Sequence, residues 1–172
     1  MKGQFIKVKG HRLSFWEGDA LVFETYCGYG RNGFTSDKRE GDGCTPVGTF
    51  PLLLAFGTGR NPGTAMEYRQ IGPLSFWSGE KESYNRWVEL EDESASMPRS
   101  ERLADYPVQY RHAMFIGYNA DAPEWGRGSA IFLHCRASDH WSTAGCISIA
   151  RAKMLRLLRE CRPGVTVTIE EG

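Results

Sequence analysis

The sequence lacks long hydrophobic runs, a dominant charge and an export signal. No stretch of the 172 residues approaches the roughly 18 consecutive apolar residues of a membrane-spanning helix. The opening MKGQFIKVKG has no apolar core of a secretory signal peptide. Basic and acidic residues number 21 each and form no long block. Nucleic acid is therefore not an expected partner, because its phosphates are bound by clustered cations.

The cysteines lack the spacing of a disulfide framework. There are 5 of them, an odd number, so we expect mostly reduced thiols. Four side chains are potential zinc ligands, namely His134, Cys135, His140 and Cys146. Their spacing matches no common zinc motif. We therefore expect no metal and no cofactor, with a zinc-stabilised domain kept as an alternative.

Short apolar runs separated by glycine predict a mainly β protein, at the margin of the α+β class. The chain holds 20 glycines, above the usual share of about seven per cent. Residues 4–9, 12–16 and 20–26 alternate apolar and polar side chains, which is typical of a meander of strands. The length fits one domain spanning residues 1–172.

One clear helix is expected near the C-terminus. Between Ala150 and Arg162, apolar residues recur at the spacing of a single helical face, and Pro163-Gly164 ends the pattern. The final VTVTI alternates in the manner of a last strand.

The segment IFLHCRASDHWSTAGCISI combines a histidine and a cysteine with two strand-like runs. The run 130–133 predicts a buried strand with His134 at its exit, and CISI predicts a second strand. A period of two places Ile147 and Ile149 on the core face, so the Cys146 thiol is expected to point away from the core. Pairing of the two strands as a hairpin would bring the thiol and the imidazole together.

Such a pair is suited to nucleophilic catalysis. A thiolate attacks carbonyl carbons, and His134 can take the thiol proton. Gly145 permits a sharp turn, which would leave the amides of Gly145 and Cys146 free to face a developing oxyanion. A free cysteine is more often a small buried hydrophobe, the interpretation favoured for Cys27, Cys44 and Cys161. For Cys146 the residues alone leave both interpretations open.

Four segments, in order, resemble the YkuD-type L,D-transpeptidase family over roughly residues 20–165: KREGDG, YNRWV, FIGYN and the segment from GSAIFLH to TAGC. The resemblance implies two packed β-sheets and a cysteine enzyme that acts on peptidoglycan stem peptides. It would form a thioester, release D-alanine, and make 3-3 crosslinks or exchange D-amino acids. Cys146 matches the nucleophile and His134 the base, and the backbone carbonyl of Cys135 would orient the imidazole.

Substrate-binding residues are also expected. In relatives the FIGYN strand lines the cleft, which points to Tyr118 and Asn119. Arg136 is the nearest cation for an anionic stem peptide. Trp141 would form an aromatic wall and Thr143 precedes the cysteine turn. Structural roles remain open for Tyr118, Arg136 and Trp141.

The resemblance leaves two other functions open and implies a location. Water as the acceptor would make the protein an L,D-carboxypeptidase or another cysteine amidase. A chain without catalysis would be a peptidoglycan-binding module. The family's substrate implies the cell envelope, periplasm or extracellular space, although this chain shows no export signal. The oligomeric state is not indicated.

Overall fold

The computed structural model describes residues 2–137 and 139–172, and strands dominate it. The bounds of the strands are β1 Gln4–Lys9, β2 Arg12–Glu17, β3 Ala20–Gly28, β4 Phe34–Thr35, β5 Thr45–Pro46, β6 Gly48–Gly57, β7 Tyr68–Gln70, β8 Ser75–Trp77, β9 Trp87–Glu89, β10 Glu101–Arg102, β11 Ala113–Ile116, β12 Phe132–Cys135, β13 Ile147–Ile149 and β14 Thr166–Glu170. The helical elements are α1 Arg151–Glu160 and two 3-10 turns, Lys81–Ser83 and Leu103–Asp105.

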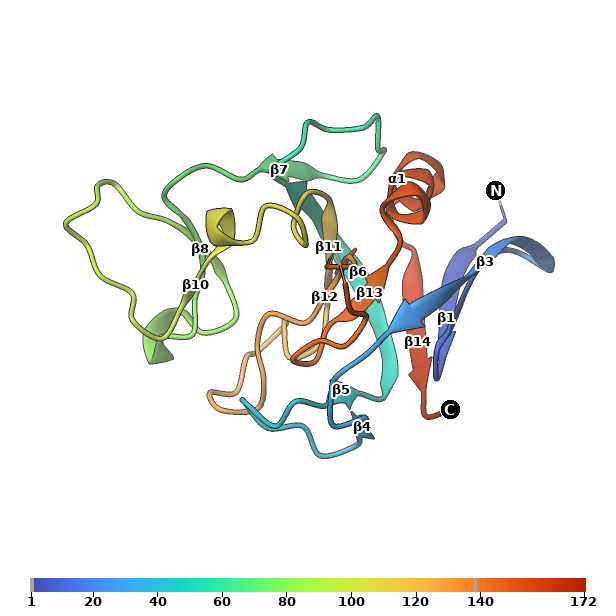
Figure 1. Ribbon diagram of the computed structural model, residues 1–172, viewed down its shortest axis with the longest axis horizontal. Helices are drawn as coiled ribbons and strands as arrows, with labels where there is room; N and C mark the ends of the chain where they lie inside the picture. The colour runs from blue at the N-terminus through green and yellow to red at the C-terminus, as the bar shows by residue number, and fades with distance from the viewer. Residues whose placement is uncertain (1, 138) are drawn as a thin grey trace.

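The N-terminal meander forms as its alternation predicts. Strands β1, β2 and β3 pair antiparallel in sequence, and their alternate residues Ile6, Val8, Leu13 and Phe15 are fully buried. Gly10 at the first turn has a φ of 55°, a conformation that glycine adopts without strain. The last strand, β14, joins β1 in parallel, so the two ends of the chain lie in one sheet (Figure 1).

The main sheet closes on itself rather than forming two packed sheets, which corrects the expected architecture. Its strands follow the order β11-β12-β13-β3-β2-β1-β14-β6-β7, and an additional β11–β6 pairing joins the chain of strands into a ring. Strand β7 lies outside that ring on β6. A separate sheet of order β10-β8-β9 lies to one side (Figure 1).

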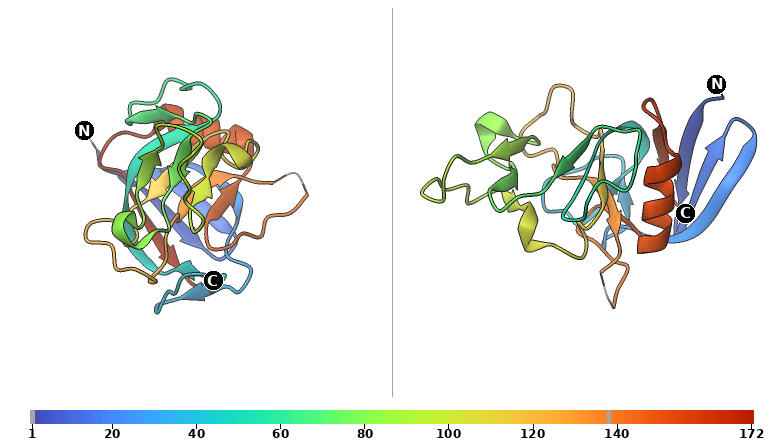
Figure 2. Two further views of the ribbon diagram at one scale, coloured as in Figure 1. Left: turned by 90° about the vertical axis from the view of Figure 1, so that its left-hand side faces the viewer. Right: turned by 90° about the horizontal axis from the view of Figure 1, so that it is seen from above.

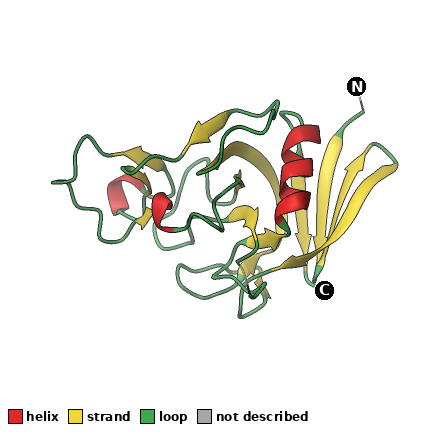
Figure 3. Cartoon of the chain, turned by 45° about the horizontal axis from the view of Figure 1, so that its top comes forward, coloured by secondary structure: helices red, strands yellow, loops and turns green. Residues whose placement is uncertain are grey.

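The C-terminal helix is confirmed, with slightly shorter bounds than expected. Helix α1 ends at Glu160, and the backbone N–H of Cys161 caps it by donating to Leu157. Its apolar face, with Met154, Leu157 and Leu158, is buried. The opposite face carries arginine, and Arg156 lies over the Phe23 ring at 5.0 Å, so α1 packs beside the meander (Figures 2 and 3).

Strands β11, β12 and β13 and the last four residues of β6 are buried on both faces, and the apolar residues form two cores. Their inner faces join the meander and α1 in a first core that includes Leu52, Met114, Leu133, Ile147 and Ile149. Their outer faces form a second core under the small sheet. Its members are Leu54, Phe56, Ile71, Trp77, Leu103, Tyr110, Ala113, Phe115, Phe132 and Cys146.

The polar segment after β9 begins exposed and then covers the second core. Residues 91–96 are exposed, as their composition predicts. Next, β10 pairs with β8, and the following 3-10 turn buries Leu103 completely. This segment therefore forms one wall above the strands that carry His134 and Cys146.

Candidate active site

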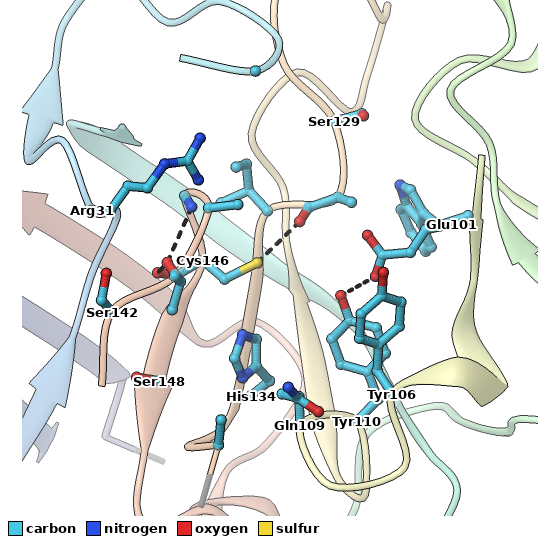
Figure 4. A pocket seen from close by; sticks show the side chains of 18 of the residues that line it. Arg31, Glu101, Tyr106, Gln109, Tyr110, Ser129, His134, Ser142, Cys146 and Ser148 are labelled. Atoms are coloured by element: carbon cyan, nitrogen blue, oxygen red, sulfur yellow. Dashed lines mark hydrogen bonds between the residues drawn. The ribbon is translucent and has the colours of Figure 1, made fainter. Parts of the chain in front are cut away.

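A cleft of about 830 Å³ opens between the second core and the loops after β3 and β12. Cys146 and His134 both line it (Figure 4). Cys146 is 9% exposed and His134 is 7% exposed. Both side chains are thus largely desolvated yet reach the cleft.

A parallel strand pair, not a hairpin, brings the two residues together. Strands β12 and β13 pair in parallel, with His134 opposite Ser148 and Leu133 opposite Ile147. His134 lies inside β12 rather than at its exit, and Cys146 immediately precedes β13. Two parallel neighbours need a crossover connection, because they cannot be joined by a tight turn.

The thiol points away from the first core, as expected, but into the second core. Two backbone groups hold it: the N–H of Phe132 donates to Sγ at 3.3 Å, and the thiol donates to the carbonyl of Ala130 at 3.2 Å. Burial raises the pKa of Cys146 to about 12, because desolvation disfavours the thiolate. The thiol is therefore protonated at neutral pH.

The imidazole of His134 is oriented by the backbone. Its Nδ1 lies 2.7 Å from the carbonyl oxygen of Cys135, as the resemblance implies. A carbonyl oxygen only accepts, so Nδ1 carries the proton and Nε2 is left as the basic nitrogen. Burial lowers the pKa of His134 to about 4. The imidazole is therefore neutral at pH 7, and Tyr110 packs edge-on against it with ring centroids 5.6 Å apart.

The turn before Cys146 differs in one respect from the expectation. The N–H of Gly145 is not free, because it donates to Oγ1 of Thr143 at 3.0 Å. That hydroxyl in turn donates to the carbonyl of Cys146 at 2.6 Å. Among the hydrogen bonds of residues 2–137 and 139–172, none has the Cys146 N–H as donor.

Thr45 supports this turn from another part of the chain. Its side chain is fully buried, accepts from the N–H of Gly30 at 2.9 Å and donates to the carbonyl of Gly145 at 2.8 Å. A Cβ on Gly145 would come within 2.9 Å of the Cys44 carbonyl, so the turn requires glycine. Thr45 was not expected at the site, although it lies two residues after the KREGDG segment that carries the resemblance.

Only some of the expected substrate-binding residues line the cleft. Trp141 and Thr143 do. Arg136 is not among the lining residues, and its guanidinium lies over the Trp141 ring at 4.6 Å.

Tyr118 and Asn119, expected from FIGYN to bind substrate, are not among the residues that line this cleft. The Tyr118 hydroxyl donates to the carbonyl of Arg127 at 2.6 Å. The side-chain amide of Asn119 donates to the carbonyls of Glu124 and Gly128. Both residues instead hold the loop that leads to β12, because their polar atoms are engaged with its backbone.

Asn85, within the YNRWV segment, fixes the backbone that contacts the thiol. Its side chain is 1% exposed. The Oδ1 atom accepts from Trp77 Nε1 at 2.8 Å and from the N–H of Ala130 at 3.0 Å. Ala130 has a φ of 55°, which is uncommon for a residue with a Cβ. The Asn85 bond therefore helps to hold Ala130 where its carbonyl meets the thiol.

Five charged residues that were not expected at the site from the sequence also line the cleft. They are Arg31, Lys38, Glu40, Arg99 and Glu101. Lys38 is 3% exposed and pairs with Asp42, an arrangement that lowers the cost of burying an ammonium. The KREGDG loop is thus not simply solvated, since Lys38 and Glu40 face the cleft.

The zinc alternative finds no geometric support. In the part of the chain that the structure describes, no group of three or more His, Cys, Asp or Glu side chains is placed to hold a metal ion. No helix among the described residues is long and apolar enough to cross a membrane.

Comparison with solved structures places the fold among L,D-transpeptidases. One similar structure is an L,D-transpeptidase from Mycobacterium smegmatis, with a TM-score of 0.51, 13% identity, and coverage of 98% of this chain and 59% of that one. Another is an Enterococcus faecium L,D-transpeptidase mutant, with a TM-score of 0.52, 12% identity, and coverage of 99% of this chain and 50% of that one. A third is the Ldtfm-avibactam carbamoyl enzyme, with a TM-score of 0.51, 14% identity, and coverage of 100% of this chain and 50% of that one.

The family of this chain follows from a match between its sequence and a protein-family model. The model of the YkuD L,D-transpeptidase catalytic domain matches residues 4–169, so the chain belongs to that family, as the motifs predict. No curated protein matches this chain. The chain spans between half and three fifths of the three solved structures described above.

Proposed function

We propose that this protein is a cysteine L,D-transpeptidase that acts on peptidoglycan stem peptides through a thioester on Cys146. The observation that carries the proposal is the shared cleft, in which the thiol and an imidazole of fixed tautomer lie on neighbouring strands. Family membership supports the reaction class. The family's substrate lies in the cell envelope, which we propose as the location.

The first half-reaction transfers the thiol proton to His134. Because both groups are neutral at pH 7, the thiolate forms as the substrate binds and the thiol leaves the Ala130 carbonyl. The Phe132 N–H, already directed at the sulfur, then stabilises the negative charge. Sulfur attacks the carbonyl carbon before D-alanine, the C–N bond breaks, and imidazolium gives its proton to the leaving amine.

The oxyanion formed in this step requires hydrogen-bond donors. The Cys146 N–H is one candidate, because no described acceptor engages it. The Gly145 N–H would have to leave Thr143 Oγ1 to become the second. Each such donor contributes roughly 3 kcal/mol of transition-state stabilisation. Thr143 would thus control whether one or two donors reach the oxyanion.

The second half-reaction determines the product. An acceptor amine attacks the thioester carbonyl, the C–S bond breaks, and the sulfur recovers a proton from His134. A second stem peptide as acceptor gives a 3-3 crosslink, and a D-amino acid gives exchange. Water as acceptor would make the protein an L,D-carboxypeptidase.

The products formed from tetrapeptide muropeptides test the proposal. Wild-type protein should release D-alanine and yield crosslinked dimers, measured by liquid chromatography and mass spectrometry. Cys146→Ala should yield neither, because no thioester can form. Tripeptides without dimers would reject transpeptidation in favour of hydrolysis. Intact tetrapeptides with bound ligand would favour a non-catalytic binding module.

A further inference from the structure

The cleft carries a carboxylate whose charge no ion pair balances. Glu101 lies on β10 and lines the cleft with Cys146 and His134. Its carboxylate accepts a hydrogen bond from the Tyr110 hydroxyl. Within residues 2–137 and 139–172, no cationic side chain lies within the 4.0 Å of an ion pair with Glu101.

Neighbouring carboxylates are balanced in other ways. Glu80 pairs with Arg99 at 3.6 Å, and Asp42 pairs with Lys38. Glu40, which also faces the cleft, forms no ion pair among the described residues either, but two hydroxyls, those of Tyr84 and Ser129, donate to its Oε1. Among the described residues, one side chain, that of Tyr110, donates to the Glu101 carboxylate, so its second oxygen keeps its accepting capacity for a ligand.

Tyr110 connects Glu101 to the strand that carries His134. Tyr110 is buried and packs edge-on against both His134 and Phe132. These contacts restrain the hydroxyl that donates to the Glu101 carboxylate. Glu101 lies on one side of Cys146 and Arg31 on the other (Figure 4). Burial and, to a smaller extent, the charge of Glu101 raise the pKa of the Cys146 thiol, and burial raises the pKa of Glu101 itself.

We propose that Glu101 binds and deprotonates the ammonium group of the acceptor in the second half-reaction. This assignment rests on the proposed function and deepens it. An unpaired, partly desolvated carboxylate attracts a cation strongly, because the surrounding apolar residues weaken screening. It does not assist acylation, since a negative charge beside the sulfur opposes thiolate formation.

The proton balance is complete with groups that are present. Acceptor R–NH₃⁺ gives one proton to Glu101, and the resulting amine attacks the thioester carbonyl carbon. The new C–N bond leaves a second proton for neutral His134. The C–S bond then breaks, His134 returns that proton to the sulfur, and Glu101 releases its proton to solvent. The sum is thioester plus ammonium giving amide, thiol and one proton.

The charge of the acceptor provides the test. A D-amino acid presents an ammonium at neutral pH, whereas hydroxylamine is largely neutral and needs no deprotonation before attack. In Glu101→Gln, whose side chain still fits beside Tyr110, transfer to the D-amino acid should fall about tenfold or more relative to wild type. Transfer to hydroxylamine should stay within about twofold. The readout is product yield from a tetrapeptide donor by mass spectrometry.

Controls separate this role from a general loss of structure. Glu93→Gln, an exposed glutamate of the same segment outside the cleft, should leave both transfers unchanged. Acylation by avibactam, followed by intact mass, should be no slower in Glu101→Gln. Glu101→Asp, which retains the charge, should recover part of the transfer to the D-amino acid.

Two results would overturn the assignment. One is equal retention of both transfers in Glu101→Gln, and the other is equal loss of both. A wild-type protein that forms no acyl adduct at all would be a different outcome, because it would refute the proposed thioester and the role of Glu101 with it.

Discussion

The two faces of strands β12 and β13 contain different kinds of residue although they share one backbone. The inner face, with Leu133, Ile147 and Ile149, packs into the first core. On the outer face, His134 and Cys146 bond to backbone carbonyls, and Ser148 donates to the Trp141 carbonyl at 2.7 Å. Buried polar side chains are tolerated there because each has a backbone partner. The inner face thus serves stability, whereas the outer face places His134, Cys146 and Ser148 at the cleft.

The largest expected stability effect lies on the inner face. Ile149→Ala removes fully buried methyl groups and should lower the free energy of unfolding by roughly 2–5 kcal/mol. Ser148→Ala, one position earlier and facing outward, loses one hydrogen bond and should cost about 1–2 kcal/mol. Urea unfolding of the two variants measures the contrast. Equal costs would remove the distinction between the faces.

The next effect is a pH dependence that arises on the outer face. Because the pKa of His134 is lowered to about 4, the unfolded chain binds a proton between pH 6.5 and 4 that the folded chain does not. The stability from neutral His134 is therefore present above pH 6.5 and is lost as the pH falls, by about 3 kcal/mol.

The matched variant for this prediction is His134→Asn, whose amide can still donate to the Cys135 carbonyl. Its free energy of unfolding should fall less than that of wild type between pH 7 and pH 4. Both proteins share every other titrating group, so the difference between their urea midpoints reports His134. Parallel pH profiles would argue against a buried neutral imidazole.

The smallest of these effects concerns Thr45, which supports the turn before Cys146. Thr45→Val preserves shape but removes the bonds to Gly30 and Gly145, with an expected cost of about 1–2 kcal/mol. The rate of acylation should also fall, because the Gly145 carbonyl loses its partner. Thr49→Val, which breaks an exposed bond to Thr168, is the matched control and should change neither quantity. A normal acylation rate in Thr45→Val would mean that the turn holds its shape unaided.

Much of the fold was accessible from the sequence because it depends on local patterns. Alternation predicts the meander, and spacing predicts α1. The closed ring was not predicted, because the β11–β6 pairing joins distant segments and leaves no local signal. The same limit explains the parallel β12–β13 pair, since sequence proximity suggested a hairpin.

The candidate site was predictable only in part. The histidine, the cysteine and the orienting carbonyl of Cys135 come from one contiguous segment. Thr45, Asn85 and Glu101 reach the site from other strands and loops, and the sequence alone does not indicate which distant polar residue will face a cleft. Tyr118 and Asn119 were expected to bind substrate, but their side chains donate to carbonyls of the loop that leads to β12.

The account depends most on Cys146 acting as the nucleophile, and intact mass spectrometry after exposure to avibactam or a carbapenem tests this directly. Native protein should gain one covalent adduct, located by peptide mapping on Cys146, and Cys146→Ala should gain none. An unmodified native protein, or an equal adduct on Cys146→Ala, would contradict the account.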